Sequence, residues 1–390
     1  MVQDTATGFV REIMLEYAAL TGLDPTGARP RRYLWTDAFA VCNYLDLFRR
    51  TDDETFRDLA LRLVGEVHRT LGRHRGDDPR VGWISGLAAE EGEQHPTIGG
   101  LRIGKDLNER AIGEPFDERL EWDRDGQYYH YLTKWMHVLS RVASVTGDFT
   151  YLRWATELAR TAHAAFTYVP PSGGGKRMYW KMSIDLSRPL VPSMGQHDPL
   201  DGFVTYSELQ AARNRFGASV GIDLSPEIAD MAGICRGTRF VTDDPLGIGG
   251  LLSDASRIAR LTIEGGVFGT GLLESVLDAA RVGLASFAAR GSTGYPAEYR
   301  LAFRELGLAI GLAGVPEIRE GLEAHPGVFG RAPSLLRRVQ GLAEYLPLGE
   351  AIVGFWLDEQ NRKAATWLDH REINMVMLAT SLAPGEFLKV

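Results

Sequence analysis

The sequence predicts an all-α fold, a closed ring of helical hairpins known as an α/α toroid. Apolar residues recur at three- and four-residue steps in about twelve segments, which is the spacing of one helix face. Long or Gly/Pro-rich connections precede every second helix, whereas most other connections are shorter. A ring of hairpins would collect the long loops at one end and the tight turns at the other. The sequence shows no repeat beyond this alternation, and an all-α solenoid is the competing architecture.

The first three helices follow from apolar spacing and capping residues. They are expected over residues 8–20, 36–49 and 51–71. Thr36 is placed to cap the second helix, and Thr51 with Glu54 forms a capping box for the third. A loop rich in Gly, Pro and charge then fills residues 73–126. Loops of this length inside a compact domain are uncommon and usually functional.

A fourth helix is expected over about residues 127–145, directly after an acidic stretch that contains Trp122. Its apolar residues share one face, and unpaired N–H groups at its start favour nearby acidic groups. A fifth helix is expected over residues 150–166. A second long loop follows over residues 168–201, and residues 178–184 in it have the pattern of a hairpin.

The later helices are expected in six further segments. They are residues 203–216, a short helix from Ser225, and residues 247–261, 272–287, 296–313 and 334–345, followed by a last helix at 372–382. The stretch 347–366 is ambiguous, because residues 351–357 fit a strand and a helical turn equally well.

Composition bounds the class of protein. With 44% hydrophobic and 24% charged residues, the 390-residue chain is typical of a globular protein with a sizeable core. The ring predicts one domain over residues 1–390. A net charge of −8 argues against a dedicated nucleic-acid binder. Two distant cysteines, no signal-peptide pattern and no apolar run of membrane-spanning length lead us to expect a cytoplasmic protein that does not associate with membranes.

Polar and aromatic residues lie at the start of the helices that follow long loops. In a ring of hairpins these starts meet at one end, so separate segments would deliver carboxylates, histidines and aromatic rings to a common mouth. The residues are Trp35 and Asp37; Asp123, Asp125, Gln127, Tyr128 and His130; His197, Asp198 and Asp201; Asp243 and Asp244; Tyr295 and Glu298; and Asp369, His370 and Glu372.

Two of these segments and the hairpin rhythm resemble a known family. The stretches YLWTDAF (33–39) and WDRDGQY (122–128) resemble the six-hairpin glycosidase superfamily. Its (α/α)6 barrels include unsaturated glucuronyl hydrolases and, with related barrels, N-acylglucosamine 2-epimerases. The resemblance covers nearly the whole chain as architecture and implies an (α/α)6 barrel that acts on carbohydrates. It does not identify one subfamily.

The residue types at the mouth suit sugar chemistry independently of that resemblance. Glycoside cleavage needs one protonated carboxyl group as general acid and a second carboxylate as base or nucleophile. Asp37, Asp123, Asp125 and Asp198 are the candidates, with His197 as a supporting group. Aromatic rings can stack on sugars while polar neighbours bond the hydroxyls. The substrate-binding candidates are Trp35, Trp122, Gln127, Tyr128, His130, Trp180, Tyr206 and His370.

Each of these residues also has a structural interpretation. Asp37, Asp198 and Asp201 fit helix caps, and Asp123 and Asp125 fit solvated partners of neighbouring arginines. Tyr128 belongs to an apolar stripe that fits a helix core. His130 suits a buried, hydrogen-bonded histidine as well as a proton shuttle.

The first functional hypothesis is therefore a glycoside hydrolase with paired carboxylates and a small saccharide substrate. The second is a sugar epimerase or isomerase in which His130, His197 or His370 transfers protons. The third is a toroid without catalysis that binds a saccharide or a protein. The three hypotheses differ in what happens to the sugar. A hydrolase splits it, an epimerase or isomerase converts it without a change of mass, and a binding protein leaves it unchanged.

The sequence predicts no cofactor and no metal. Residues 99–105 have the glycine and lysine spacing of a phosphate-binding loop, but Asp106 replaces the Ser or Thr that would hold magnesium. His68 and His74 do not have zinc-ligand spacing, and the sequence contains no HExxH motif. Neither a dinucleotide fingerprint nor a GxSxG nucleophile elbow is present.

Overall fold

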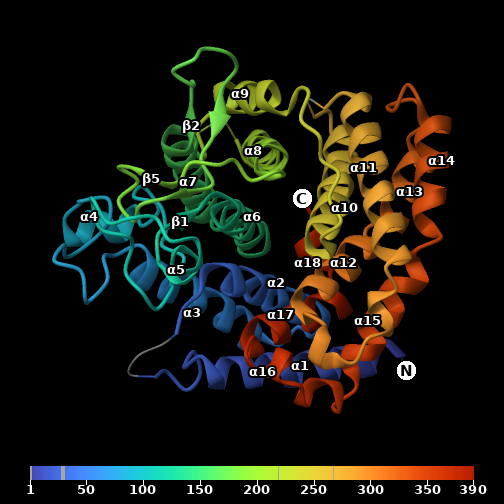
Figure 1. Ribbon diagram of the computed structural model, residues 1–390, viewed down its shortest axis with the longest axis horizontal. Coiled ribbons are helices and arrows are strands. Elements are labelled where there is room, and N and C mark those ends of the chain that lie inside the picture. The colour runs from blue at the N-terminus through green and yellow to red at the C-terminus, as the bar shows by residue number, and fades with distance from the viewer. Residues whose placement is uncertain (1, 28–30, 218, 267) are drawn as a thin grey trace. The chain divides into compact units, whose positions relative to one another are not determined.

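The computed structural model describes residues 2–27, 31–217, 219–266 and 268–390, and it confirms the all-α class (Figure 1). Helices form most of the described chain, and the strands in it are two or three residues long. The longer helices are α1 (Val2–Leu20), α2 (Leu34–Thr51), α3 (Glu54–Leu71), α6 (Tyr129–Thr146), α7 (Thr150–Phe166), α8 (Asp198–Phe216), α9 (Ser225–Cys235), α10 (Pro245–Ile263), α11 (Thr270–Ala289), α12 (Ala302–Ala313), α13 (Val315–Ala324), α14 (Ala332–Ala343), α15 (Leu346–Leu357) and α17 (Arg371–Leu382). The short ones are α4 (Ala89–Gln94), α5 (Glu118–Asp123), α16 (Ala365–Leu368) and α18 (Gly385–Leu388).

The predicted helices are confirmed except at a few ends. Helix α8 begins at Asp198 instead of residue 203, with Pro199 in its first turn, where a missing N–H costs nothing. The ambiguous stretch is helical and forms α15 and α16. Helix α13 was not predicted, although Pro316 marks its first turn and Ile318 and Leu322, one turn apart, are buried.

The chain divides into two compact units, which are described separately. Unit 1 contains Met1–Leu20, Cys42–Asp53 and Arg239–Val390, and unit 2 contains Thr21–Val41 and Glu54–Thr238. The division falls within helix α2, between Val41 and Cys42. The single domain expected from the sequence stays a prediction.

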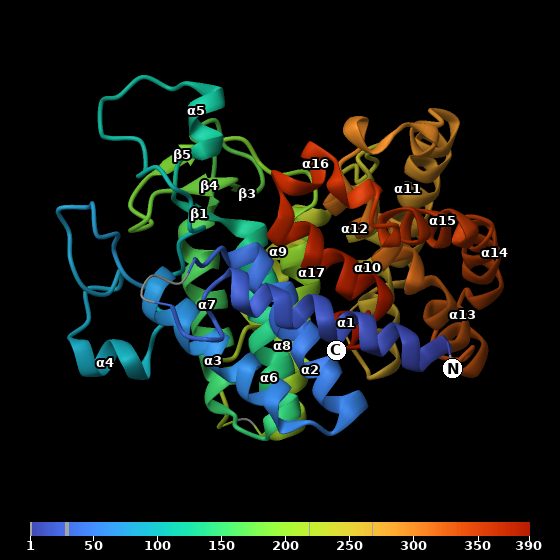
Figure 2. The ribbon, with the colours of Figure 1, turned by 90° about the horizontal axis from the view of Figure 1, so that it is seen from below.

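Unit 2 is organised around helices α6, α7 and α8, which pack on one another (Figures 1 and 2). Helices α6 and α8 run parallel, as the order of their side-chain contacts shows. Lys134 contacts Asp201, and further towards the C-terminal ends of both helices His137 contacts Glu208. Alternate helices of consecutive hairpins are expected to run parallel, so their N-terminal ends meet here as the sequence predicted.

Short strands connect the long loops of unit 2. Strand β4 (Lys181–Met182) pairs antiparallel with β1 (Gln127–Tyr128) and with β5 (Pro189–Val191). Strand β3 (Arg177–Met178) pairs with β2 (Thr167–Tyr168). Strands therefore form where the hairpin was expected at residues 178–184, but β3 and β4 pair with other segments and not with each other.

Unit 1 is a packed set of helices in which α10 and α12 make an extensive contact. Small residues allow this contact, since a Cβ added at Gly249 would lie 2.0 Å from the Gly307 carbonyl oxygen. Asn43, on the second half of α2, donates to the Val376 carbonyl at 3.0 Å and accepts from Thr380 at 2.8 Å. These buried bonds tie the unit's early segments to its last helices.

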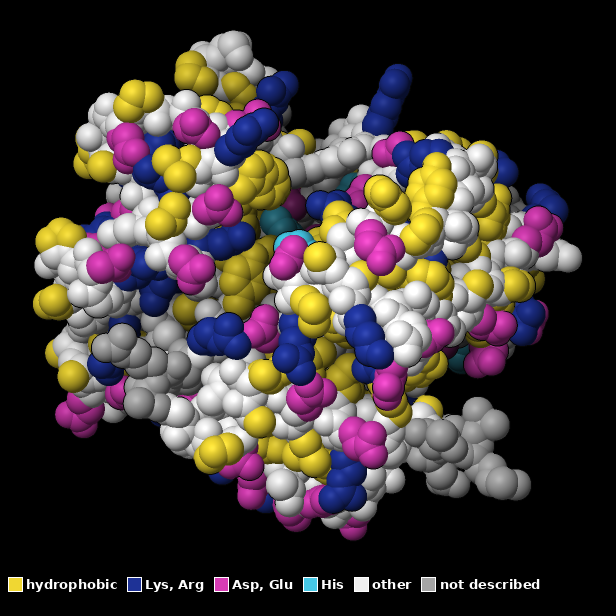
Figure 3. All heavy atoms as spheres, turned by 60° about the horizontal axis from the view of Figure 1, so that its bottom comes forward, with side chains coloured by type: hydrophobic (Ala, Val, Ile, Leu, Met, Phe, Trp, Pro, Cys, Tyr) yellow, Lys and Arg dark blue, Asp and Glu magenta, His cyan; other side chains and the backbone are white. Residues whose placement is uncertain are grey.

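On the face that Figure 3 shows, acidic and basic side chains are interspersed. None of the helices described is both long and apolar enough to cross a membrane.

Candidate active site

The candidate active site is built on two side chains at the N-terminal ends of α6 and α8. His130 is the second residue of α6 and Asp198 is the first residue of α8. His130 Nδ1 lies 3.8 Å from Asp198 Oδ1, with side-chain exposures of 27% and 7%. Within the part of the chain that the structure describes, neither His130 Nδ1 nor Asp198 Oδ2 has a hydrogen-bond partner. Buried polar atoms are nearly always bonded, so these two atoms make the pair a candidate site.

Burial sets the protonation of this pair. Burial, aided by the nearby Asp201 carboxylate and opposed by Lys134, raises the pKa of the Asp198 carboxyl to about 8. It lowers the pKa of the His130 imidazole to about 4, with Asp201 opposing and Lys134 adding to the effect. A helix N-terminus favours a carboxylate, so burial outweighs the helix at Asp198. At neutral pH Asp198 carries a proton and His130 is uncharged.

Aromatic rings surround His130. Tyr128 stacks on it at 5.5 Å between ring centroids, and the plane of Trp180 is nearly parallel to it at 6.5 Å. Trp35 and Tyr131 meet it edge-on at 5.8 and 4.8 Å. Three of the four rings, those of Trp35, Tyr128 and Trp180, were predicted as substrate-binding residues, and the structure brings them together around the histidine.

The aromatic group continues to the surface through Trp122. Its ring meets Trp180 edge-on at 4.9 Å, and the residue is 48% exposed. Lys181 lies beneath Tyr128, with Nζ 5.3 Å from the ring centroid, and is fully buried. Its ammonium donates to the carbonyls of Glu121 and Arg124 and so fixes β4 against α5.

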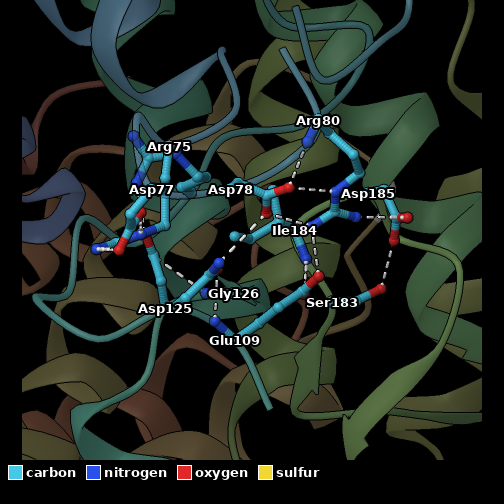
Figure 4. Close-up of polar contacts among 12 residues, drawn as sticks. Arg75, Asp77, Asp78, Arg80, Glu109, Asp125, Gly126, Ser183, Ile184 and Asp185 are labelled. Atoms are coloured by element: carbon cyan, nitrogen blue, oxygen red, sulfur yellow. Dashed lines mark hydrogen bonds and ion pairs between the residues drawn. The ribbon is translucent and has the colours of Figure 1, made fainter. Parts of the chain in front are cut away.

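Asp125 is held in an ion-pair network with Arg75 and its neighbours (Figure 4). The fully buried Asp125 carboxylate pairs with Arg75 and Arg102 and accepts from the Gly104 and Gly126 N–H groups. Every acceptor position of this carboxylate is in use. We therefore assign Asp125 to the anchoring of the long loop and leave it out of the proposed catalytic set.

Gln127 is equally committed to that loop. Its Oε1 accepts from the Leu101 N–H at 2.9 Å, and its Nε2 donates to the Gly99 and Ile184 carbonyls. The side chain is completely buried. We correct its predicted role from ligand contact to the joining of three backbone segments.

Asp37 and Tyr206 are also buried within the fold. Asp37 accepts from the Tyr33 N–H at 3.0 Å and faces the Arg32 guanidinium at 3.6 Å, which is the helix-start role weighed in the sequence. Tyr206 is 0% exposed and its hydroxyl accepts from Tyr129 at 2.9 Å. Neither suits contact with a ligand, and both leave the proposed site.

Three further candidates lie at other positions. Asp123 is exposed at the end of α5, and His197 is half-buried at the N-cap of α8, next to Asp198. His370 belongs to unit 1, where it is exposed at the N-cap of α17 with Phe303 at 5.5 Å. Of the predicted catalytic residues, Asp198 lies 3.8 Å from His130.

Sequence reasoning missed several residues of this site. Tyr131 was not among the substrate-binding candidates, yet it contacts His130 and its hydroxyl lies 2.7 Å from that of Tyr33. Gly195 was not singled out, although a Cβ there would lie 2.4 Å from Asp198 Oδ2. The four-residue spacing of His130 and Lys134 on α6 was a usable signal, since it places both on one helix face.

No family model matches the chain, and no curated protein matches it in sequence. The chain is similar to solved structures of sugar-processing enzymes. A sugar epimerase from a ruminal bacterium aligns over 91% of this chain and 88% of its own at 11% identity, with a TM-score of 0.46.

Two more solved structures have comparable scores. Cellobiose 2-epimerase of Spirochaeta thermophila aligns over 95% of this chain and 97% of its own at 12% identity, with a TM-score of 0.48. A GH76 α-mannanase of Bacteroides thetaiotaomicron aligns over 97% of each chain at 10% identity, with a TM-score of 0.49. The function of this chain is therefore inferred from its own residues.

The arrangement of those residues suits proton transfer. Among the described residues, no group of three or more His, Cys, Asp or Glu side chains is arranged to hold a metal ion. A neutral imidazole beside a protonated carboxyl provides one group that accepts a proton and one that donates it near neutral pH.

Proposed function

We propose that the chain is a carbohydrate-active enzyme in which His130 and Asp198 transfer protons to and from a bound sugar. The observation that carries the proposal is this pair, with its unbonded buried atoms, its unusual protonation and its aromatic surroundings. Aromatic faces stack on the C–H faces of sugars, and perturbed pKa values in a cleft are characteristic of catalytic groups.

His130 is the group that would meet the substrate. Its Nδ1 is buried and faces Asp198, so the exposed part of the ring lies away from Nδ1. In the proposed reaction Nε2 accepts a proton from the sugar and returns one to it. As the imidazolium forms, the Asp198 carboxyl gives its own proton to a sugar oxygen, so the imidazolium then faces a carboxylate. Both groups regain their starting protonation when the product forms.

The short separation within the pair favours epimerisation or isomerisation. Glycosidase carboxyl groups stand about 5 to 9.5 Å apart, which leaves room for the scissile bond or a water between them. His130 and Asp198 are 3.8 Å apart, so they would act on neighbouring atoms of one sugar. Moving a proton between neighbouring carbons on one face of the sugar is isomerisation, whereas epimerisation at one carbon also needs a group that returns the proton to the opposite face.

Hydrolysis is the second candidate, and the protonation of Asp198 supports it. A glycosidase needs a carboxyl that is still protonated at neutral pH, which is the state that burial gives to Asp198. The second carboxylate is the missing part. Asp37 and Asp125 both face arginines, so it would come from Asp123 or from another part of the chain.

A panel of mono- and disaccharides, incubated with the protein in H2O and in D2O, separates these reactions by mass spectrometry. Epimerisation keeps the mass in H2O and adds one deuterium in D2O, whereas hydrolysis splits a disaccharide and adds water. A sugar that binds in calorimetry and is never converted would instead support the binding protein that acts without catalysis.

Single variants then test the assignment of the two residues. We expect His130→Asn and Asp198→Asn each to lower kcat by about 100-fold or more, the usual contribution of general acid–base catalysis, while circular dichroism stays unchanged. His325→Asn is the matched control, because that histidine is exposed at the end of α13. Full activity in both active-site variants would sink the proposal.

A further inference from the structure

A second polar pair lies directly beside His130 and Asp198, about one helical turn along α6 and α8. Lys134 Nζ lies 2.7 Å from Asp201 Oδ1, and the side chains are 13% and 7% exposed. The Thr133 hydroxyl donates to the other oxygen of Asp201. Lys134 follows His130 by four residues and Asp201 follows Asp198 by three, so each helix presents one member of each pair on the same face.

We propose that Lys134 and Asp201 are a pair of positioning residues, which hold α6 against α8 at the active site and balance the electric field on His130 and Asp198. Neither is a catalytic residue, because both are engaged with each other. This inference rests on the function proposed for His130 and Asp198, and it assigns the control of their protonation to a named ion pair.

The two charges of the ion pair act in opposite directions on both groups. The Asp201 carboxylate raises the pKa of Asp198 and of His130, and the Lys134 ammonium lowers both. A negative charge favours a bound proton and a positive charge opposes it. The two charges oppose each other, with the effect of Asp201 the larger, and burial remains the largest influence on both groups.

Other titratable groups also lie around the pair in unit 2. Tyr128 at the start of α6 and the buried Tyr129 and Tyr206 have pKa values raised by burial. Tyr131 also faces His130, with its hydroxyl bonded to Tyr33. From β4, Lys181 pairs with Glu121, and at the N-cap of α8 His197 adjoins Asp198.

The test is an NMR titration of the histidine imidazoles in full-length protein labelled with 15N-histidine, with the His130 signal assigned by its loss in His130→Gln. We expect Lys134→Met to raise the His130 titration midpoint and Asp201→Asn to lower it, each on the order of one pH unit. The double variant should return close to the wild-type midpoint, because both charges are gone.

The opposite signs distinguish this role from a merely structural one, which would disturb the site without a charge-dependent direction. Shifts of the same sign, or no shift in either variant, would overturn the proposal. Lys176→Met is the matched control, since Lys176 also pairs with an aspartate, Asp230, and should leave His130 unchanged. If Asp201→Asn does not fold, the upward shift in Lys134→Met decides alone.

The titration needs no substrate, so its outcome is independent of the sugar assay. Failure of every sugar to react or bind would count against the proposed function while the two opposite shifts could still be measured. If a sugar is converted, the pH profile of kcat should move upward in Lys134→Met and downward in Asp201→Asn, with little change in KM.

Discussion

A single residue, Asp198, shows most clearly how stability and function conflict in this protein. Its carboxyl is buried at a helix start, has one oxygen without a hydrogen bond, and holds its proton up to a pKa of about 8. A buried charge is expensive, so the native state resists ionisation of this group. A site optimised for stability alone would replace it with a neutral side chain.

We predict that Asp198→Asn stabilises the protein more at pH 9 than at pH 4. The native carboxyl holds its proton up to about pH 8, whereas the unfolded chain loses it near pH 4. Between these values the native state binds more protons, so this group makes wild-type stability fall as pH rises. The asparagine variant lacks that fall and should gain a few kcal/mol by pH 9. Urea unfolding at several pH values measures it; an equal effect at pH 4 and pH 9 would contradict it.

The residue scale also shows where sequence reasoning was limited. The motif around Trp122 drew attention to Asp125, because its acidic and aromatic residues looked like an open site. Arg75 and Arg102 neutralise Asp125 from distant positions in the sequence, and no local pattern reveals such partners. His130 and Asp198 were both named as candidates, but their meeting depends on the packing of α6 against α8.

At the scale of elements, ion pairs and hydrogen bonds join the long loop at residues 73–126 to the rest of unit 2. Arg80 pairs with Asp78, Glu109 and Asp185, and Glu109 in turn accepts from the Ile184 N–H (Figure 4). These bonds join the loop to the strand region that carries Trp180. The loop therefore contributes to the proposed site by holding Trp180, one of the aromatic rings next to His130, in place.

We predict that Asp125→Ala changes stability and does not act as a catalytic substitution. Two arginines and two backbone N–H groups would lose their shared acceptor, which costs about 3 to 5 kcal/mol for a broken buried ion pair. The free energy of unfolding from urea denaturation measures this loss. Asp123→Ala, at an exposed position, is the control and should leave stability within about 0.5 kcal/mol. A stable Asp125→Ala protein that lost only kcat would return Asp125 to the catalytic set.

Elements were predictable where their signal was local. Helices α3, α7 and α11 follow from apolar spacing, because one face of each is buried against neighbours whatever those neighbours are. The strands β1, β4 and β5 are two or three residues long and exist through pairing with distant segments. Sequence periodicity cannot detect a strand of that length.

At the scale of the whole molecule, the order of segments along the chain differs from their grouping into units. Unit 1 takes Met1–Leu20, Cys42–Asp53 and Arg239–Val390, so unit 2 is inserted between its parts and α2 contributes to both. The two units were not predictable from the sequence, because the chain has no linker between them. Apolar spacing predicted the all-α class and alternating loop lengths predicted the ring of hairpins, but neither pattern indicates this grouping.

We predict that the fragment 1–238 is insoluble when expressed alone and is recovered in soluble form when coexpressed with 239–390. The buried residues Val10, Met14 and Tyr17 of α1, and Asn43 with its bonds to the last helices, would lack their partners. Soluble yield and size-exclusion chromatography measure the outcome. A monodisperse, stable fragment 1–238 would contradict it.

The interleaving of the units also has a consequence for synthesis on the ribosome. Helix α1 and the segment Cys42–Asp53 are synthesised before unit 2 is complete, whereas Arg239–Val390, the rest of their unit, follows unit 2. At usual translation rates that interval is on the order of tens of seconds. During that time the face of α1 that packs on α17 lacks this neighbour, so the nascent chain is exposed to aggregation at α1, and chaperone binding there would protect it until α17 forms.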